Sequence, residues 1–417
     1  MEATTEPRRH RGIAPGSFQF IVLMSMGMAV TALSIDAVLP AYGHIRDSLG
    51  MAADDSAVTG LVTFYFMGSG VGLIPAGLLA DRYGRRPVMW GGLMLFALAA
   101  AATAFMPTLS AMLVTRFAWG MGSAGPRVAA LAMVRDVYEG EEMARMMSLI
   151  MAAFILVPTI APSLGSAILV VGPWQWIVWF CALFGVVVAL GVFRLPETLP
   201  VEHRRPLDLS EMKTSMSLAI REPGMVGYLI AFTLLTGAFM SYLASSQLVI
   251  DKVFGLDRWF PLIFGAIAIT MGAGMVFNSW AVERVGLDRL TGWAMMIYLI
   301  MAGALLAIAL VNDGVPPFWL FLPAIAGTLL FLQMLGPNIN SAAMRPMAAV
   351  AGTAAALLGM VSSVFGALLG GVVDHEFNAT ITPIAIGMMV YGLVAAVSWR
   401  WATRSQLMAR QAKQASA

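Results

Sequence analysis

The sequence is short of charge and of cysteine. Lysine and arginine number 25 and aspartate and glutamate 23, so charged residues make up only 12% of the 417 residues. Soluble proteins contain about 25% charged residues, and this composition therefore argues against a soluble enzyme. The only cysteine, Cys181, excludes an internal disulfide and a cluster of thiolate metal ligands.

Motifs for catalysis, metal binding and nucleic-acid binding are also missing. The four histidines are scattered without the spacing of metal ligands, and there is no HExxH, Walker or G-x-S-x-G motif. The net charge of +2 comes with no run of Lys and Arg that would bind phosphates. We therefore predict no enzyme activity, no catalytic residue, no metal site and no nucleic-acid partner.

Apolar residues, by contrast, make up 59% of the chain, and the mean hydropathy is +0.81. Twelve apolar stretches come close to the roughly 20 residues that a helix needs to cross a bilayer. They cover residues 18–40, 57–79, 88–106, 110–133, 147–171, 174–193, 225–248, 260–280, 290–311, 317–336, 348–372 and 382–399. Only three charged residues fall within them, Asp36, Arg116 and Arg127. Because charged side chains are costly within lipid, the pattern predicts an all-α membrane protein with twelve transmembrane helices.

The positive charges predict the orientation in the membrane. Nearly all Lys and Arg residues outside the apolar stretches fall in connections on the same side as the N-terminus, and Arg46, Lys252 and Arg258 are the exceptions. Cytoplasmic loops are enriched in Lys and Arg. We therefore expect a multi-pass protein in the lipid bilayer with both termini in the cytoplasm.

The longest predicted connection divides the chain into two halves with six apolar stretches each. We expect an N-terminal half at 1–193, a cytoplasmic central loop at 194–224, and a C-terminal half with a basic tail at 225–417. A faint repeat supports this division, since segments 77–87 and 279–289 carry an acid, an Arg and a Gly in the same register. Parallel halves of this kind are typical of transporters that bind substrate between them.

Short motifs carry a resemblance to a known family. Residues 77–87, which read G-x-x-x-D-R-x-G-R-R-P, resemble the signature loop of the major facilitator superfamily. Residues 34–40 are similar to the first-helix Asp-x-x-Leu-Pro pattern of its bicyclomycin-resistance (Bcr/CflA) branch of drug:proton antiporters, and residues 116–120 to the fourth-helix Arg motif. Residues 134–138 and 195–199 also resemble this branch. The resemblance implies the major facilitator fold in a bacterial cytoplasmic (inner) membrane.

The resemblance further implies a cytoplasmic gate of charges at the ends of the second, third and fourth helices. Its predicted members are Gly77, Asp81, Arg82, Gly84, Arg85, Arg86, Arg135 and Asp136. Gly77 would permit a close approach of helices, and Gly84 would permit a positive φ in a tight turn. We expect the network to hold the outward-open state and to break when the halves move. The alternative is a set of separate solvated charges, with each pair worth under about 1 kcal/mol.

Asp36 and Arg116 are the predicted proton-coupling residues. Asp36 is the only acid within a predicted span, and intramembrane carboxylates often relay protons. Arg116 should lie at a similar depth, so we expect it to pair with Asp36 and to release it when substrate enters; the resemblance also gives this Arg a coupling role. The alternative is a structural Asp36 that bonds to a neighbouring helix.

The predicted substrate cavity has a pliable lining, because the chain contains 32 methionines and Met side chains adapt to varied ligands. The predicted lining residues are Arg127, Met28, Tyr65, Trp119, Phe239 and Tyr242. Arg127 either binds an anionic group of the substrate or extends its charge toward water. Each Met or aromatic residue also has the alternative of packing between helices or against lipid.

These features together predict a monomeric secondary transporter that works by alternating access. It would export small amphipathic drugs or toxic compounds, with protons as the coupling ion and no cofactor. The alternative is a transporter of the same fold for one specific metabolite, as importer or exporter. A receptor or a membrane enzyme would need a soluble domain or a catalytic cluster, and the predicted connections contain neither.

Overall fold

The computed structural model describes residues 13–415 apart from 15, 53–54, 205–208 and 348–349. The described residues form helices, turns and loops but no strand. The twelve long helices are α1 (Phe18–Asp36), α3 (Gly60–Tyr83), α4 (Arg85–Thr103), α5 (Leu109–Val137), α6 (Gly140–Val171), α7 (Gln175–Phe193), α9 (Met225–Leu248), α10 (Phe260–Val285), α11 (Leu287–Val311), α12 (Phe318–Met344), α13 (Ala351–His375) and α14 (Thr382–Ala415). Each overlaps one predicted span, so the prediction of twelve transmembrane helices is confirmed.

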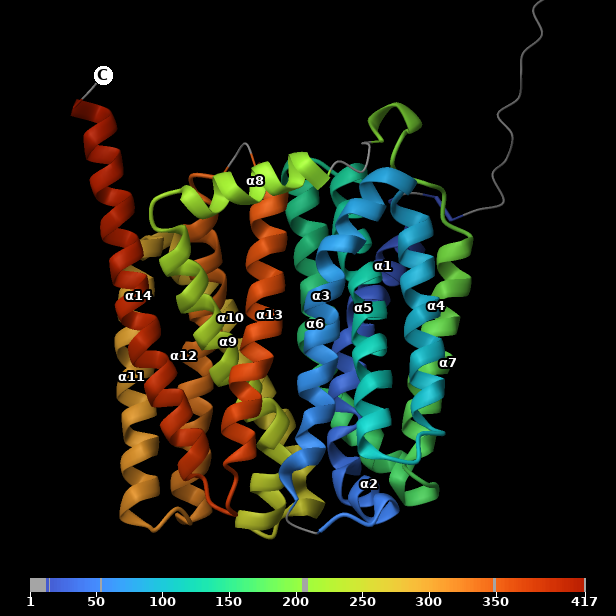
Figure 1. Cartoon of the computed structure of the whole chain (residues 1–417), viewed down its shortest axis with the longest axis vertical. Helices are drawn as coiled ribbons and strands as arrows, with labels where there is room; N and C mark the ends of the chain where they lie inside the picture. The colour runs from blue at the N-terminus through green and yellow to red at the C-terminus, as the bar shows by residue number, and fades with distance from the viewer. Residues whose placement is uncertain (1–12, 15, 53–54, 205–208, 348–349, 416–417) are drawn as a thin grey trace, which may run out of the picture.

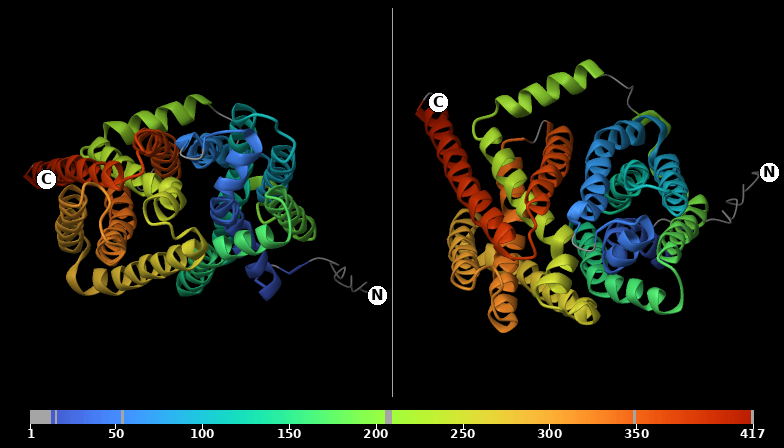
Figure 2. Two further views of the ribbon diagram at one scale, coloured as in Figure 1. Left: turned by 90° about the horizontal axis from the view of Figure 1, so that it is seen from below. Right: turned by 60° about the horizontal axis from the view of Figure 1, so that its bottom comes forward.

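The long helices form two six-helix bundles (Figure 1). In the first, α5 packs between α3 and α4, while α1 lies against α6 and α4 against α7. In the second, α9 packs against α13 and α14, and α11 against α12. The bundles meet mainly where α3 contacts α13 and where α6 contacts α10, which Figure 2 shows from the end of the molecule. The predicted arrangement of two halves is confirmed.

Two short helices mark the two ends of the molecule. Helix α8 (Leu209–Arg221) lies across the end to which the C-terminus of α14 points, and α2 (Tyr42–Leu49) lies at the opposite end (Figure 1). We call these ends the α8 side and the α2 side. Helix α1 runs from the α8 side to the α2 side, and each following long helix runs in the direction opposite to the one before it (Figure 1).

The first span ends earlier than the sequence suggests, and the reason is Pro40. In a continued helix the backbone N–H of residue 40 would donate to the carbonyl of Asp36, but proline has no N–H. Helix α1 therefore ends at Asp36, and Leu39–Ala41 forms a 3₁₀ turn. The acid thus lies at the last turn of a helix instead of inside one.

Close packing of α3 on α5 depends on two glycines. A Cβ atom at Gly68 would lie 1.9 Å from the carbonyl oxygen of Phe117, and one at Gly120 would lie 1.9 Å from the carbonyl oxygen of Tyr65. The two backbones are therefore in direct contact. Gly120 is the glycine of the fourth-helix motif, so this contact gives a physical reason for the residue type there.

Candidate functional site

A cavity of about 1090 Å³ lies between the two halves. It extends from Asp36, at the end of α1 on the α2 side, to Asp81, Arg85, Arg135 and Asp136 on the α8 side. The other lining residues come from both bundles and include Phe66, Arg127, Phe232, Thr236, Phe239, Tyr242, Phe264, Gln333, Asn340 and Ser362. Its walls are therefore mostly apolar and aromatic with a few polar groups, which is the usual character of a site for small molecules.

Asp36 lies at the α2-side end of this cavity. Its side chain is buried, and it makes no hydrogen bond or ion pair with the described part of the chain. The hydroxyls of Thr31 and Tyr242, which line the same cavity, are buried and likewise have no partner among the described residues. A buried carboxylate without a described protein partner, at the end of a cavity that also has a buried tyrosine hydroxyl in its lining, is suited to bind a proton or a cationic group that enters through the cavity.

Arg116 is buried beside the end of α1 but does not pair with Asp36. Its Nη1 atom donates a hydrogen bond to the backbone carbonyl of Ser34 at 3.1 Å. Its guanidinium also lies over the rings of Trp119 and Tyr65, at 4.5 and 5.7 Å from their centroids. The expected ion pair is absent between these two described side chains, because the guanidinium donates to the Ser34 carbonyl and packs on the rings of Trp119 and Tyr65 instead.

Three predicted cavity residues lie inside the N-terminal half and not on the cavity. Trp119 and Tyr65 are fully buried, with ring centroids 6.2 Å apart, and the hydroxyl of Tyr65 accepts a hydrogen bond from Ser34. Met28 is buried on α1. Trp119 also packs edge-to-face on Phe96 of α4. The sequence correctly put these residues on helices, but it did not reveal which helix face turns inward.

The other three predicted residues, Arg127, Phe239 and Tyr242, do line the cavity. Tyr242 stacks on Phe264 of α10, with ring planes 9° apart. Arg127 is exposed to the cavity and has neither a salt bridge nor a hydrogen bond to any other residue that the structure describes. The polar residues of the C-terminal half that join them include Gln333, whose only sequence signal is its polarity within an apolar stretch, and Asn340, which lies in the predicted connection after that stretch.

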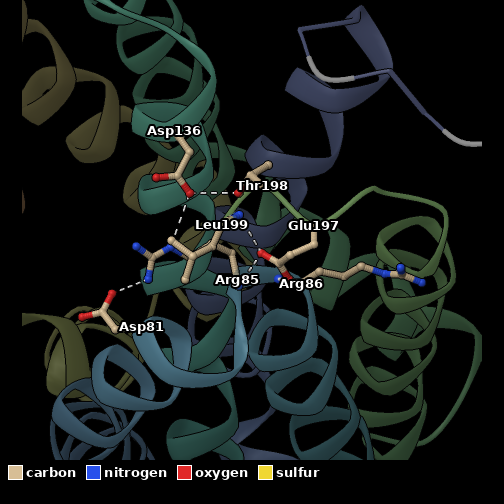
Figure 3. Close-up of polar contacts among 7 residues, drawn as sticks. All are labelled: Asp81, Arg85, Arg86, Asp136, Glu197, Thr198 and Leu199. Carbon is tan, nitrogen blue, oxygen red and sulfur yellow. Dashed lines mark hydrogen bonds and ion pairs between the residues drawn. The ribbon is translucent and has the colours of Figure 1, made fainter. Parts of the chain in front are cut away.

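The predicted gate contains a chain of ion pairs in the N-terminal half (Figure 3). Arg85, at the start of α4, bonds to Asp81 at the end of α3 and, at 3.4 Å, to Asp136 at the end of α5. Thr198, which follows α7, donates a hydrogen bond to the same oxygen of Asp136 at 2.9 Å. The network thus joins the ends of three helices and the loop after a fourth, all within one half.

Glu197 caps the N-terminus of α4, a role that the sequence did not reveal. Its carboxylate accepts hydrogen bonds from the backbone N–H groups of Arg85 and Arg86, at 2.8 and 3.1 Å (Figure 3). These N–H groups have no partner within the helix, and a negative charge is favourable at a helix N-terminus. The segment 195–199 resembles a family motif, but nothing near it in sequence indicated a partner so far away along the chain.

The two gate glycines, Gly77 and Gly84, have different structural roles. Gly84 has a φ of 108°, which confirms the predicted positive φ, and a Cβ atom there would lie 2.4 Å from the Glu197 carboxylate. A Cβ atom at Gly77 would meet nothing within 4 Å, so this residue faces the cavity and the expected close helix approach is absent. The interpretation of Gly77 as a packing glycine was therefore wrong for this conformation.

The remaining gate arginines lie at the edge of the network. Arg86 donates a hydrogen bond to the carbonyl of Phe193 and lies over its ring, 5.1 Å from the centroid. It therefore ties α4 to the end of α7. Arg82 is exposed and Arg135 lines the cavity, and neither forms an ion pair with another described residue.

A second polar cluster lies on the α2 side, and the sequence did not indicate it. Asp374 is buried near the end of α13, where its Oδ1 accepts a hydrogen bond from Ser245 and its Oδ2 has no described partner. Arg46 of α2 is buried and lies 3.9 Å from Asp251, which follows α9, so this pair joins the two halves. The predicted span ended at residue 372, yet α13 continues to His375. Asp36 is therefore not the only buried acid at a span.

Comparisons with known proteins agree with this geometry. The profile described as Major Facilitator Superfamily matches residues 23–371. The chain is 25% identical over 399 residues to a bicyclomycin resistance protein homolog of Haemophilus influenzae, covering 94% of this chain and 98% of the relative. It is 26% identical over 387 residues to multidrug resistance protein D of Escherichia coli, covering 91% and 94%.

Solved structures have the same fold at low sequence identity. A D-xylose-proton symporter superposes with a TM-score of 0.76 at 14% identity, over 92% of this chain and 97% of that one. The human organic anion transporter MFSD10 superposes with a TM-score of 0.61 at 19% identity, over 93% and 100%. Identities this low support the fold alone.

Proposed function

The chain belongs to the Major Facilitator Superfamily, and we propose that it exports small amphipathic compounds across a bacterial cytoplasmic membrane in exchange for protons. The relatives named for bicyclomycin and multidrug resistance, which match over nearly their whole length, support a drug as the substrate. The observation that carries the proposal is the position of Asp36, a buried acid without a described protein partner at the end of the cavity between the halves.

The proposed orientation places the α8 side in the cytoplasm. Most Lys and Arg residues outside the spans lie on this side, including Arg85 and Arg86, as expected for cytoplasmic loops. The cavity reaches the α8 side, where Asp81 is 48% exposed, whereas Arg46 and Asp251 join the halves on the α2 side. This is the arrangement of an inward-facing transporter, which takes up its cargo from the cytoplasm.

Proton exchange would take place at Asp36. A cationic or strongly polar substrate group near this carboxylate would compete with a proton for it, and such competition is what couples export to proton entry. Arg116 would act as a positioning residue, because it holds the last turn of α1 through the Ser34 carbonyl. The proton is the coupling ion in this scheme, which uses no nucleotide or metal, and the chain works as a monomer.

The predicted gate would stabilise the outward-open state of the transporter. The Asp81–Arg85–Asp136 network is intact within the N-terminal half although the cavity reaches the α8 side, so in this conformation it has not broken as we expected. We propose that closure on the α8 side brings this half against the C-terminal half, so that the same charges then act between the halves and favour the outward-open state.

A second candidate function, transport of one specific metabolite, has a structural observation in its favour. The C-terminal half contributes the polar residues Gln333, Asn340, Ser362 and Ser363 to the cavity lining. Fixed polar groups of this kind suit a single hydroxylated substrate better than a range of drugs. Such a transporter would change growth on one nutrient and leave drug tolerance unaltered.

A susceptibility test distinguishes the two candidates. The protein is expressed in a bacterium that lacks its main efflux pumps, and growth inhibition is measured for a panel of amphipathic antibiotics and dyes, with and without an uncoupler. Drug export predicts a rise in tolerance to several compounds that the uncoupler removes. Unchanged tolerance to the whole panel, with the protein present in the membrane, would contradict the proposal.

A further inference from the structure

Arg127 places an unneutralised positive charge in the wall of the cavity. Its side chain is exposed to the cavity, and no carboxylate that the structure describes pairs with it. Arg85, by contrast, has two carboxylate partners at the cavity mouth. A guanidinium with free donors forms its strongest contacts with carboxylate and phosphate groups.

The packing of α1 on α5 gives the position of Arg127 relative to Asp36. A Cβ atom at Gly27 would lie 3.7 Å from the Cβ of Pro126, so Gly27 and Arg127 are at nearly the same depth. From Gly27 to Asp36, α1 rises by about 14 Å at 1.5 Å per residue. The two charges therefore lie at well-separated depths along the cavity.

The wall that both charges share includes aromatic side chains. Phe239 and Tyr242 of α9 line the cavity together with Phe264 of α10, on which Tyr242 stacks at a centroid distance of 6.2 Å. The volume of about 1090 Å³ is enough for a drug-sized molecule with a ring system. The site thus offers a negative group, a positive group and an aromatic surface.

The charge of the substrate follows from the proton exchange proposed above. A simple anion at Arg127 would bind best when Asp36 is neutral, so anion and proton would enter the site together and not in exchange. A cationic group at Asp36 competes with the proton but leaves Arg127 without a counter-ion. A molecule with both charges satisfies both side chains and still displaces the proton.

We propose that this transporter's substrates are amphipathic zwitterions, with the cationic group at Asp36, the carboxylate at Arg127 and an aromatic body between them. This inference rests on the proposed function and adds the chemical class of the cargo. It also assigns Arg127 the role of a specificity-determining residue, because it selects compounds by their carboxylate.

Binding to the full-length protein in lipid nanodiscs tests the assignment. The probes are a biphenyl with an aminomethyl group at one end and a carboxylate at the other, its carboxamide, and its N-acetyl derivative. Equilibrium dialysis should give an affinity for the zwitterion at least about tenfold above that for the carboxamide, the order expected for a charge-assisted hydrogen bond. The Arg127→Gln variant should lower zwitterion binding to the carboxamide level and leave carboxamide binding unchanged.

Two further variants make the result specific. Arg127→Lys keeps the charge but lacks the planar pair of donors, so its preference for the carboxylate should be intermediate. Arg289→Gln removes an exposed Arg of α11 outside the cavity lining and should bind all three probes as the wild type does. Unchanged carboxamide binding by Arg127→Gln also serves as evidence that this variant is folded.

The outcomes separate this inference from the proposed function. Equal wild-type affinity for zwitterion and carboxamide, or a preference that survives in Arg127→Gln, would overturn the assignment of Arg127. Export of neutral or purely cationic compounds with no binding of the zwitterion would overturn it as well, yet leave drug export standing. Failure of the wild type to transport any amphipathic compound would instead contradict the proposed function itself.

Discussion

The guanidinium of Arg116 donates a hydrogen bond to the backbone carbonyl of Ser34, and this bond closes the end of α1. The backbone N–H groups that follow do not bond to this carbonyl, because that of Ala37 donates to Leu33 and that of Val38 donates to Ile35. Arg116 therefore supplies a donor that the helix end lacks. Since Asp36 lies in the same last turn, any change at Arg116 alters the position of the proposed proton site.

Replacing this arginine should separate function from stability. In Arg116→Met the hydrogen bond to Ser34 is lost, but so is the cost of burying a guanidinium whose Nη2 has no described partner. These effects oppose each other, so we expect the unfolding free energy to change by less than about 2 kcal/mol. Efflux should fall at least about tenfold, because the last turn of α1 is no longer held. Thermal unfolding and efflux from loaded cells measure the two quantities.

The Arg116→Lys variant is the control for Arg116→Met. Arg116→Lys keeps one donor and should recover part of the efflux. A Met variant that exports at the wild-type rate would show that the hydrogen bond to Ser34 has no part in coupling.

Asp81→Asn tests the gate. The substitution removes one of the two carboxylate partners of Arg85. The pair is partly exposed, so its loss should cost under about 1 kcal/mol of stability, whereas drug resistance should disappear. Growth inhibition and membrane abundance are measured together, with Asp47→Asn, at an exposed acid of α2, as the matched control. Normal resistance from a well-expressed Asp81→Asn protein would remove Asp81 from the gate.

Gly84→Ala should destabilise the protein, whereas Gly91→Ala should not. An alanine at 84 must hold a φ of 108° and would place its Cβ against the carboxylate of Glu197. The expected loss is about 2 kcal/mol or more, since the strain adds to a disturbed helix cap. Gly91 lies within α4, where a Cβ atom meets nothing within 4 Å. Equal melting temperatures for the two variants would show that the Glu197 cap is unimportant.

The sequence predicted the parts of the fold that hydropathy and local geometry determine. The twelve spans, the two halves and the turn at Gly84 all follow from apolar length or from a residue type with a special backbone conformation. Asp374 was missed because its charge ended the apolar window two residues early, although the helix continues. Hydropathy cannot distinguish a helix that ends in water from one that buries its last acid.

The site was harder to predict because it depends on helix rotation. Trp119 and Phe239 look alike in sequence, yet one packs inside the N-terminal half and the other lines the cavity. Glu197 and Thr198 act on α4 and α5, and such contacts between distant segments leave no local pattern. Arg127 was left with two alternatives, and the structure places it in the cavity without a described partner.

Transport by the Asp36→Asn variant in proteoliposomes shows whether Asp36 carries the coupling proton. Purified wild-type and variant proteins are reconstituted, a proton gradient is imposed, and the movement of a fluorescent amphipathic substrate is followed against its own gradient. Asparagine is nearly isosteric with aspartate, but its amide does not bind and release a proton near neutral pH. We expect the wild type to drive uphill transport and Asp36→Asn to have none, because the variant has lost both the group that exchanges the proton and the charge that attracts the cationic part of the substrate. Uphill transport by the variant at the wild-type rate would contradict the proton role of Asp36.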